Sequence, residues 1–328
     1  MSLHYVALGD STTVGVGDPM NGSSTTDLSG AGARPGEGWR GWASLLADAL
    51  ASSHRVTFSN FATSGATVPV VATEQLPETG DGPIDIASLI VGVNDTLRSS
   101  FDAGRIRDHL QLCAEQLTAR GALLLTVRFH DHGKVFGLPR WLRRPLWHRI
   151  EQVNLAYDDL HARYGGIRLD MAAYPEIYRR DFWSVDRLHP GERGHRKLAR
   201  AFADELAVRG VRIDVPPDLD CAYRPPSRWA DALWLVREGA PWVGRRAHDL
   251  LPWAARMALT QFHPSTTKAE DDRLLTLPPS STTAEVGRLH TVPPCSTTAE
   301  VGRLLSLPPS LSSSLSAAAD AEVRHFEA

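Results

Sequence analysis

The sequence predicts an α/β protein in which a five-stranded parallel sheet carries helices on both faces. Over the first 212 residues, five short apolar stretches alternate with longer stretches in which apolar residues recur at helical spacing. Continuous apolar runs are typical of strands that are buried on both faces. Parallel neighbours need a crossover connection, so this alternation indicates right-handed strand–helix–strand units. The predicted strands cover residues 4–10, 55–60, 84–92, 122–129 and 166–171.

Four helices are predicted between and after these strands. The first follows the apolar residues from Trp39 to Leu50 and the second those from Ile106 to Leu117, each with the helical period of about 3.6 residues. The third extends over residues 139–164 and the fourth over 191–209. In folds of this type, ligands bind beyond the carboxyl ends of the strands. We therefore expect functional residues directly after the strands.

The chain after residue 212 has a different composition. Pro-Pro pairs at 216–217 and 225–226 bracket a linker, and 228–259 is rich in tryptophan and arginine and is typical of two amphipathic helices. Further on, Ser, Thr and Pro are frequent, and the sequence STTAEVGRL occurs twice, 15 residues apart. Too few apolar residues are present there to offset the entropy of ordering, so we expect disorder. The predicted organisation is an α/β domain at 1–212, a linker with amphipathic helices at 213–260, and a disordered tail at 261–328.

Composition and charge exclude several classes of protein. The chain has 35 Lys and Arg against 38 Asp and Glu, so no overall positive field would attract nucleic acid. No window approaches the roughly 18 apolar residues of a membrane span, and the first residues contain no secretory signal. Three scattered cysteines form neither a disulfide framework nor a zinc-binding spacing. We expect a cytoplasmic protein that uses no metal and no cofactor.

The first candidate residue, Ser11, directly follows the first predicted strand in the sequence Gly9-Asp10-Ser11. A serine between a buried strand and a helix directs its hydroxyl to the ligand-binding edge, where free N–H groups of the helix can stabilise negative charge. That setting suits a nucleophile. The alternative is that Ser11 only caps the helix, as serine often does.

Two candidate hydrogen-bond donors follow the second and third strands. Gly65 can present its N–H to a ligand because no Cβ shields it. The side-chain amide of Asn94 could be directed at the same point. Glycine and asparagine are also common in ordinary turns, so each position has a purely structural alternative.

An Asp–His pair, Asp186 and His189, precedes the fourth predicted helix. An aspartate three residues before a histidine can bond to Nδ1 of the imidazole and leave Nε2 facing outward. This arrangement fixes the tautomer and raises the basicity of the imidazole, as a general base requires. Together with Ser11, Gly65 and Asn94, the pair would supply a nucleophile, a base and oxyanion donors for acyl transfer.

Four sequence blocks carry a resemblance to a known family. Gly9-Asp10-Ser11, Asn60 with Gly65, Gly92-Val93-Asn94-Asp95, and Asp186 with His189 resemble, in this order, the four blocks of the SGNH/GDSL hydrolases. The resemblance covers about residues 1–212 of the sequence. It implies a flavodoxin-like three-layer αβα fold and serine ester hydrolase activity on a small-molecule ester or acyl substrate.

The resemblance also implies roles for single residues. Ser11 would be the nucleophile, His189 the base and Asp186 the acid that orients it. The N–H groups of Ser11 and Gly65 and the side-chain amide of Asn94 would form the oxyanion hole. We assign Asp10 a supporting role. Thr12 departs from the leucine of the name-giving motif, but no catalytic atom is expected from that position.

Other motifs point to competing functions. The segment 36–41 matches the G-x-G-x-x-G dinucleotide fingerprint, but no strand directly precedes it, so we do not expect nucleotide binding. The segment His130-Asp131-His132 follows the fourth strand and could bind a metal, line the substrate pocket or face solvent. His195, on the fourth helix, is expected to be structural.

Two basic, tryptophan-containing segments could contact an anionic partner. The segment 140–149 could attract an acidic substrate or head group, or form a solvated helix face. The helices at 228–259 could dock on their own domain, or they could contact a membrane surface or another protein. Two further functions therefore remain open beside the esterase. One is an acyltransferase that uses the same site, and the other is an interaction protein whose C-terminal helices and tail carry the main role.

Overall fold

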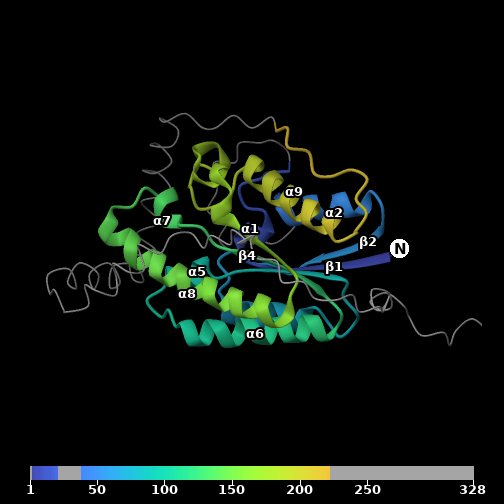
Figure 1. The fold of residues 1–328 in the computed structure, drawn as a ribbon, viewed down its shortest axis with the longest axis horizontal. Coiled ribbons are helices and arrows are strands. Elements are labelled where there is room, and N and C mark those ends of the chain that lie inside the picture. The colour runs from blue at the N-terminus through green and yellow to red at the C-terminus, as the bar shows by residue number, and fades with distance from the viewer. Residues whose placement is uncertain (1, 21–37, 222–328) are drawn as a thin grey trace, which may run out of the picture. The chain divides into compact units, whose positions relative to one another are not determined.

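A computed structural model of the protein describes residues 2–20 and 38–221. The predicted amphipathic helices at 228–259 and the predicted disordered tail at 261–328 lie outside the described residues, so both stay predictions. Within the described residues, a sheet lies between two layers of helices (Figure 1). This is the predicted αβα architecture.

The sheet has five parallel strands in the order β2-β1-β3-β4-β5. β1 lies between β2 and β3, with Tyr5 opposite Phe58 on one side and Ile86 on the other. β3 is buried along its whole length, as a continuous apolar run predicts for a strand between two helix layers. All five predicted strands are confirmed. They are β1 (Ser2–Gly9), β2 (Arg55–Asn60), β3 (Ile86–Ile90), β4 (Leu123–Arg128) and β5 (Ile167–Asp170).

Two pairs of helices cover the sheet. α2 (Gly41–Ala51) and α9 (Glu192–Val208) pack together on one face. α6 (Ala103–Ala119) and α8 (Arg140–Tyr164) pack together on the other face (Figure 1). The four predicted helices are thus confirmed.

The start of α2 differs from the prediction. The helix begins at Gly41, while Trp39 packs with Val14, Val16 and Ala62 in a separate small apolar cluster. A Cβ on Gly41 would lie only 2.2 Å from the Cα of Gly15, and Gly41 has a φ of +68°. The chain after β1 therefore contacts the first residue of α2 at a distance that only glycine permits. Hydrophobic periodicity could not reveal this contact.

The carboxyl end of β1 is the point at which the strand order reverses. From β1 the chain passes to β2 on one side and afterwards to β3 on the other, and sheets of this kind bind ligands at such a switch point. Short helices begin close after three of the strands. They are α1 (Ser11–Val14) after β1, α5 (Val93–Thr96) after β3, and α7 (His132–Val135) after β4.

Two irregular connections complete the described fold. Between β2 and β3 the chain forms α3 (Val68–Val70), a π-helical turn (Val71–Gln75) and α4 (Leu76–Glu78). After β5 it forms three 3₁₀ turns, Met171–Ala173, Pro175–Tyr178 and Arg180–Phe182, and then the segment that contains Asp186 and His189. Within the described ranges, no helix has the length and apolar character needed to cross a bilayer.

Candidate active site

Ser11 is the first residue of α1, and Asp10 is the N-cap of that helix. The Asp10 carboxylate accepts a hydrogen bond from the Thr12 N–H at 3.0 Å. The capping role that serine could have played is therefore filled by its neighbour, and the Ser11 hydroxyl is directed elsewhere. Its Oγ lies 2.7 Å from Nε2 of His189, a residue 178 positions further along the chain.

His189 is held between Ser11 and Asp186. Its Nδ1 lies 2.6 Å from Oδ2 of Asp186. The other carboxylate oxygen, Oδ1, accepts hydrogen bonds from the Ser184 hydroxyl at 2.5 Å and from the Leu188 and His189 N–H groups at 2.9 and 3.0 Å. With both oxygens occupied, the carboxylate has one orientation. Ser11, His189 and Asp186 thus form a continuous hydrogen-bonded chain.

Electrostatics at this pair oppose the effect of burial. Burial raises the pKa of Asp186, but the adjacent His189 and the hydrogen bonds to the carboxylate outweigh it, so this pKa lies below its usual value. Burial lowers the pKa of His189, and attraction to Asp186 and then Asp10 more than offsets it. The pKa of His189 is therefore raised, which makes its imidazole a stronger base.

The turn between Asp186 and His189 contains a strained residue. Arg187 has a φ of 57°, the only non-glycine residue with positive φ among the described residues. For a residue with a Cβ, this left-handed conformation costs on the order of 1–2 kcal/mol. The three hydrogen bonds to Asp186 Oδ1 hold the turn in place. Strain of this kind often marks a functional site.

The structure brings the segments that contain Gly65 and Asn94 together. The Asn94 amide donates to the Ala66 carbonyl at 3.0 Å, which leaves its second N–H for another acceptor. The adjacent Asp95 carboxylate accepts from the Val68 N–H at 3.1 Å, so two consecutive residues of α5 fix the loop after β2. Gly65 has a φ of 80°, a conformation that explains glycine at this position.

A comparison with known families decides what kind of domain this is. The model of the GDSL-like Lipase/Acylhydrolase family matches residues 7–197, which is more than half of the chain and includes the three segments just described. The chain belongs to this family. The resemblance drawn from the four sequence blocks is therefore confirmed.

Solved structures similar to this GDSL-like hydrolase have low sequence identity to it. One is a psychrotrophic esterase, EstA, from Pseudoalteromonas sp., with 15% identity and a TM-score of 0.45; the match covers 64% of this chain and 99% of that one. Another is a lipase/acylhydrolase from Enterococcus faecalis, with 19% identity, a TM-score of 0.45 and coverage of 63% and 96%. A third is a lipolytic G-D-S-L family protein from Veillonella parvula, with 20% identity, a TM-score of 0.46 and coverage of 63% and 99%. No curated protein matches the chain.

Gln75 contributes to the GDSL-like site and was not predicted. Its side chain accepts from the Gly9 N–H and donates to the Gly9 carbonyl, both at 2.9 Å, and it also donates to Thr63 Oγ1. This buried amide fixes the backbone two residues before Ser11 and ties it to the loop after β2. Gln75 ends the π-helical turn, an irregularity that often occurs at functional sites.

Asp10 lies beside the hydrogen-bonded chain and is also buried. Burial raises its pKa to about 6, although hydrogen bonds from Thr12 and attraction to His189 act in the opposite direction. The negative charge of Asp10 in turn raises the pKa of His189. Asp10 thus has two observed contributions, one to the start of α1 and one to the basicity of His189.

A pocket lies next to these residues. Its cavity volume is about 50 Å³, it is open to solvent on one side, and most of its lining is apolar. The residues on both sides of Ser11 and of His189 belong to its wall. Its lining residues are Asp10, Thr12, Ile90, Val93, Val127, Phe129, His130, His132, Met171, Ile177, Phe182, Trp183, Leu188, Pro190 and Leu198.

His130 and His132 line the pocket, as one of the three interpretations of this segment predicted. They are only 3% and 5% exposed, so the interpretation that they face solvent is wrong. The Asp131 carboxylate has other partners, because it caps α7 by accepting from the Lys134 N–H and pairs with Arg143 at 2.6 Å. The described residues contain no group of three or more side chains placed to hold a metal ion.

The basic segment 140–149 divides into structural and exposed side chains. Arg143 pairs with Asp131, the N-cap of α7, and Arg149 donates to the Thr96 and Arg98 carbonyls at the end of α5. These two arginines therefore connect α8 to α7 and to the end of α5. Trp141, in contrast, is 40% exposed.

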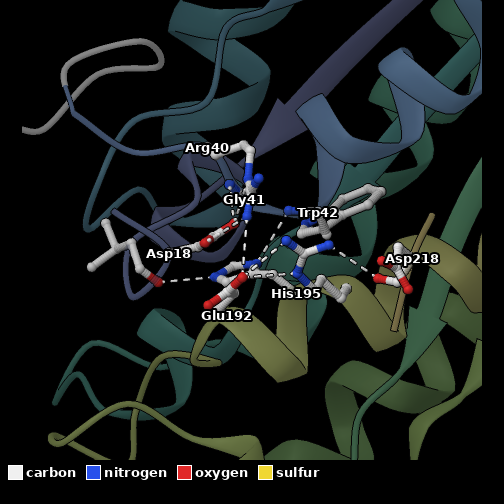
Figure 2. Close-up of polar contacts among 9 residues, drawn as sticks. Asp18, Arg40, Gly41, Trp42, Glu192, His195 and Asp218 are labelled. Carbon is white, nitrogen blue, oxygen red and sulfur yellow. Dashed lines mark hydrogen bonds and ion pairs between the residues drawn. The ribbon is translucent and has the colours of Figure 1, made fainter. Parts of the chain in front are cut away.

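Of the G-x-G-x-x-G match at 36–41, the structure describes residues 38–41, and Arg40 and Gly41 have a structural partner. The Asp18 carboxylate accepts hydrogen bonds from the Gly41 N–H and from the Arg40 guanidinium at the beginning of α2 (Figure 2). Close by, His195 accepts from the Trp42 N–H at Nδ1 and donates to the Val16 carbonyl from Nε2. His195 therefore connects α9 to α2 and to the loop after α1, as its predicted structural role requires.

Proposed function

We propose that the protein is a serine ester hydrolase that forms an acyl-enzyme on Ser11. One observation carries this proposal, namely the hydrogen-bonded chain from Ser11 Oγ through the His189 imidazole to the Asp186 carboxylate. Membership of the GDSL-like lipase/acylhydrolase family supports it.

In the proposed reaction, Ser11 Oγ attacks the ester carbonyl while His189 Nε2 takes the hydroxyl proton. Asp186 keeps Nδ1 protonated and stabilises the imidazolium that forms. The carbonyl oxygen becomes an oxyanion that accepts from the Ser11 and Gly65 N–H groups and from Asn94. The intermediate then collapses, and the alcohol leaves with the proton from His189. Water repeats these steps on the acyl-enzyme, which releases the carboxylic acid and restores Ser11.

The pocket supports the proposal that the acyl part of the substrate binds there and is small. Its walls are mostly apolar, and they include the residues on both sides of Ser11. Such a pocket suits an acyl chain whose carbonyl lies at Ser11. The alcohol part would lie towards solvent. Contact with a membrane or a partner protein through 228–259, and a cytoplasmic location, stay predictions.

The replacement Ser11→Ala tests the proposal directly. It removes the nucleophile, so we expect hydrolysis of p-nitrophenyl butyrate to fall by on the order of 10⁴-fold or more and labelling by a fluorophosphonate probe to disappear. Asn94→Ala, which removes one oxyanion donor, should lower kcat by about 10²–10³. Ser100→Ala, at an exposed position after α5, is the matched control and should keep both activity and labelling. Labelling of the Ser11→Ala protein would show that another residue is the nucleophile.

A further inference from the structure

His130 is a buried side chain without a polar partner. It is 3% exposed, and neither Nδ1 nor Nε2 has a hydrogen-bond partner among the described residues. Buried polar groups in folded proteins are nearly always hydrogen-bonded, so each exception calls for an explanation. His132, the neighbouring histidine, does have a partner, because its Nδ1 lies 3.0 Å from the His130 carbonyl.

Surrounding rings hold the His130 imidazole in place. It stacks on His132 with 4.0 Å between ring centroids, and the Trp183 and Tyr178 rings lie 5.2 and 6.1 Å away. His130 belongs to the pocket wall, and these rings restrict the rotation of its imidazole. A polar group held in place within an apolar pocket is the usual means by which such a site selects its ligand.

The chemistry of the imidazole limits what it can bind. Burial and the neighbouring His132 lower the pKa of His130 well below its ordinary value, so the ring is neutral at pH 7. A neutral imidazole offers one N–H donor and one acceptor nitrogen. A hydroxyl matches either nitrogen, because it can accept as well as donate. A carboxylate would bring an unpaired charge next to a ring that carries none, which is strongly unfavourable.

We propose that His130 is a specificity-determining residue that binds a hydroxyl on the acyl chain of the substrate. This inference rests on the proposed esterase function. The pocket wall includes the neighbours of Ser11 and of His189 as well as His130, and we place the acyl group of an ester bound at Ser11 in this pocket. The apolar walls would contact the methylene groups. The substrates would thus be esters of hydroxylated short-chain acids.

Paired esters that differ by one hydroxyl test the proposal. We would compare kcat/KM for methyl 3-hydroxybutyrate with methyl butyrate, and for methyl 6-hydroxyhexanoate with methyl hexanoate. The wild-type protein should prefer at least one hydroxylated ester by about 10-fold or more. His130→Leu should reduce that ratio to about one, and His130→Gln, which keeps a donor and an acceptor, should retain part of it. His109→Leu, on α6 and outside the pocket, is the matched control and should keep the wild-type ratio.

Thermal unfolding distinguishes binding from a structural role. Replacing an unpaired buried polar group by an apolar one is neutral or stabilising, so His130→Leu should unfold at the wild-type temperature or above. A markedly lower unfolding temperature, or the absence of any preference for a hydroxylated ester, would overturn the proposal. If no ester is hydrolysed and Ser11 is not labelled by a fluorophosphonate, the esterase proposal itself fails. Hydrolysis without a hydroxyl preference overturns only the role of His130.

Discussion

His189 and His195 lie six residues apart, both are buried, and the structure uses them in opposite ways. In His189, Nδ1 contacts a carboxylate and Nε2 contacts the Ser11 hydroxyl. In His195, Nδ1 accepts from the Trp42 N–H, so Nε2 carries the proton and donates it to the Val16 carbonyl. Their partners therefore assign the two imidazoles opposite tautomers.

The pKa values of the two histidines differ for the same reason. Burial lowers both, but only His189 has a carboxylate in contact, and its pKa is raised. The pKa of His195 is lowered by burial, and the carboxylate of Asp18 only partly opposes this. The pKa of His130, whose side chain has no polar partner among the described residues, is lowered by burial and by the neighbouring His132. Direct partners, rather than burial, thus decide whether a histidine of this protein can act as a base.

Of the replacements that test the difference between the two histidines, Asp186→Asn should have the largest effect. An asparagine cannot stabilise the positive charge of the His189 imidazolium or keep the proton on Nδ1. We therefore expect kcat to fall by about 10³–10⁴. The pKa of His189 should also fall, because its main attractive partner is gone. The rise of kcat/KM with pH, which reports the deprotonation of the base, would move to lower pH. Ester hydrolysis followed from pH 5 to 9 measures both effects. Asp81→Asn, at an exposed position, is the control, and an unchanged kcat in Asp186→Asn would contradict the assignment.

His195→Leu should affect stability rather than chemistry. The leucine leaves the Trp42 N–H and the Val16 carbonyl buried without partners, and each such loss costs roughly 1–3 kcal/mol. We expect the free energy of unfolding, measured by urea denaturation, to fall by about 2–5 kcal/mol. His54→Leu, which removes one exposed hydrogen bond to the Arg212 carbonyl, is the matched control and should have a much smaller effect. A stable His195→Leu protein without activity would show that the two histidines are not separated in function.

Asp10→Asn should give the smallest effect. The asparagine can still accept from the Thr12 N–H, but it removes a charge that raises the pKa of His189. The rise of kcat/KM with pH should therefore move to lower pH, by less than one pH unit.

Stability of Asp10→Asn should change with pH in a defined direction. The pKa of Asp10 is about 6 in the folded protein, above its ordinary value of 3.8, so the folded state binds the proton more tightly. The wild type consequently loses stability as pH rises from about 4 to about 6. We therefore subtract the free energy of unfolding of the wild type from that of the variant, both measured by urea denaturation. This difference should be more favourable to the variant at pH 8 than at pH 4. A difference of the opposite sign would contradict the raised pKa.

Local sequence signals predicted most of the fold and the contact between Asp186 and His189. The strands could be read from their apolar runs, and Asp186 and His189 share one turn, so their contact was encoded within four residues. Gln75 and His130 gave no such signal. Gln75 acts on Gly9, 66 residues away, and the importance of His130 lies in the absence of a partner among the described residues. The N-cap of α1 was also ambiguous, because aspartate and serine have similar capping preferences.

The long separation between Ser11 and His189 has a consequence for folding. Asp186 and His189 are joined within one turn, whereas Ser11 lies 178 residues before His189, after β1, which has β2 on one side and β3 on the other. Closing a loop of this length costs entropy before the contact is made, so such contacts form more slowly than local ones. The contact between Ser11 and His189 should therefore form more slowly than the local contact between Asp186 and His189. In a refolding experiment, the activity proposed for Ser11 would recover only once this contact has formed, whereas far-UV circular dichroism reports helix content.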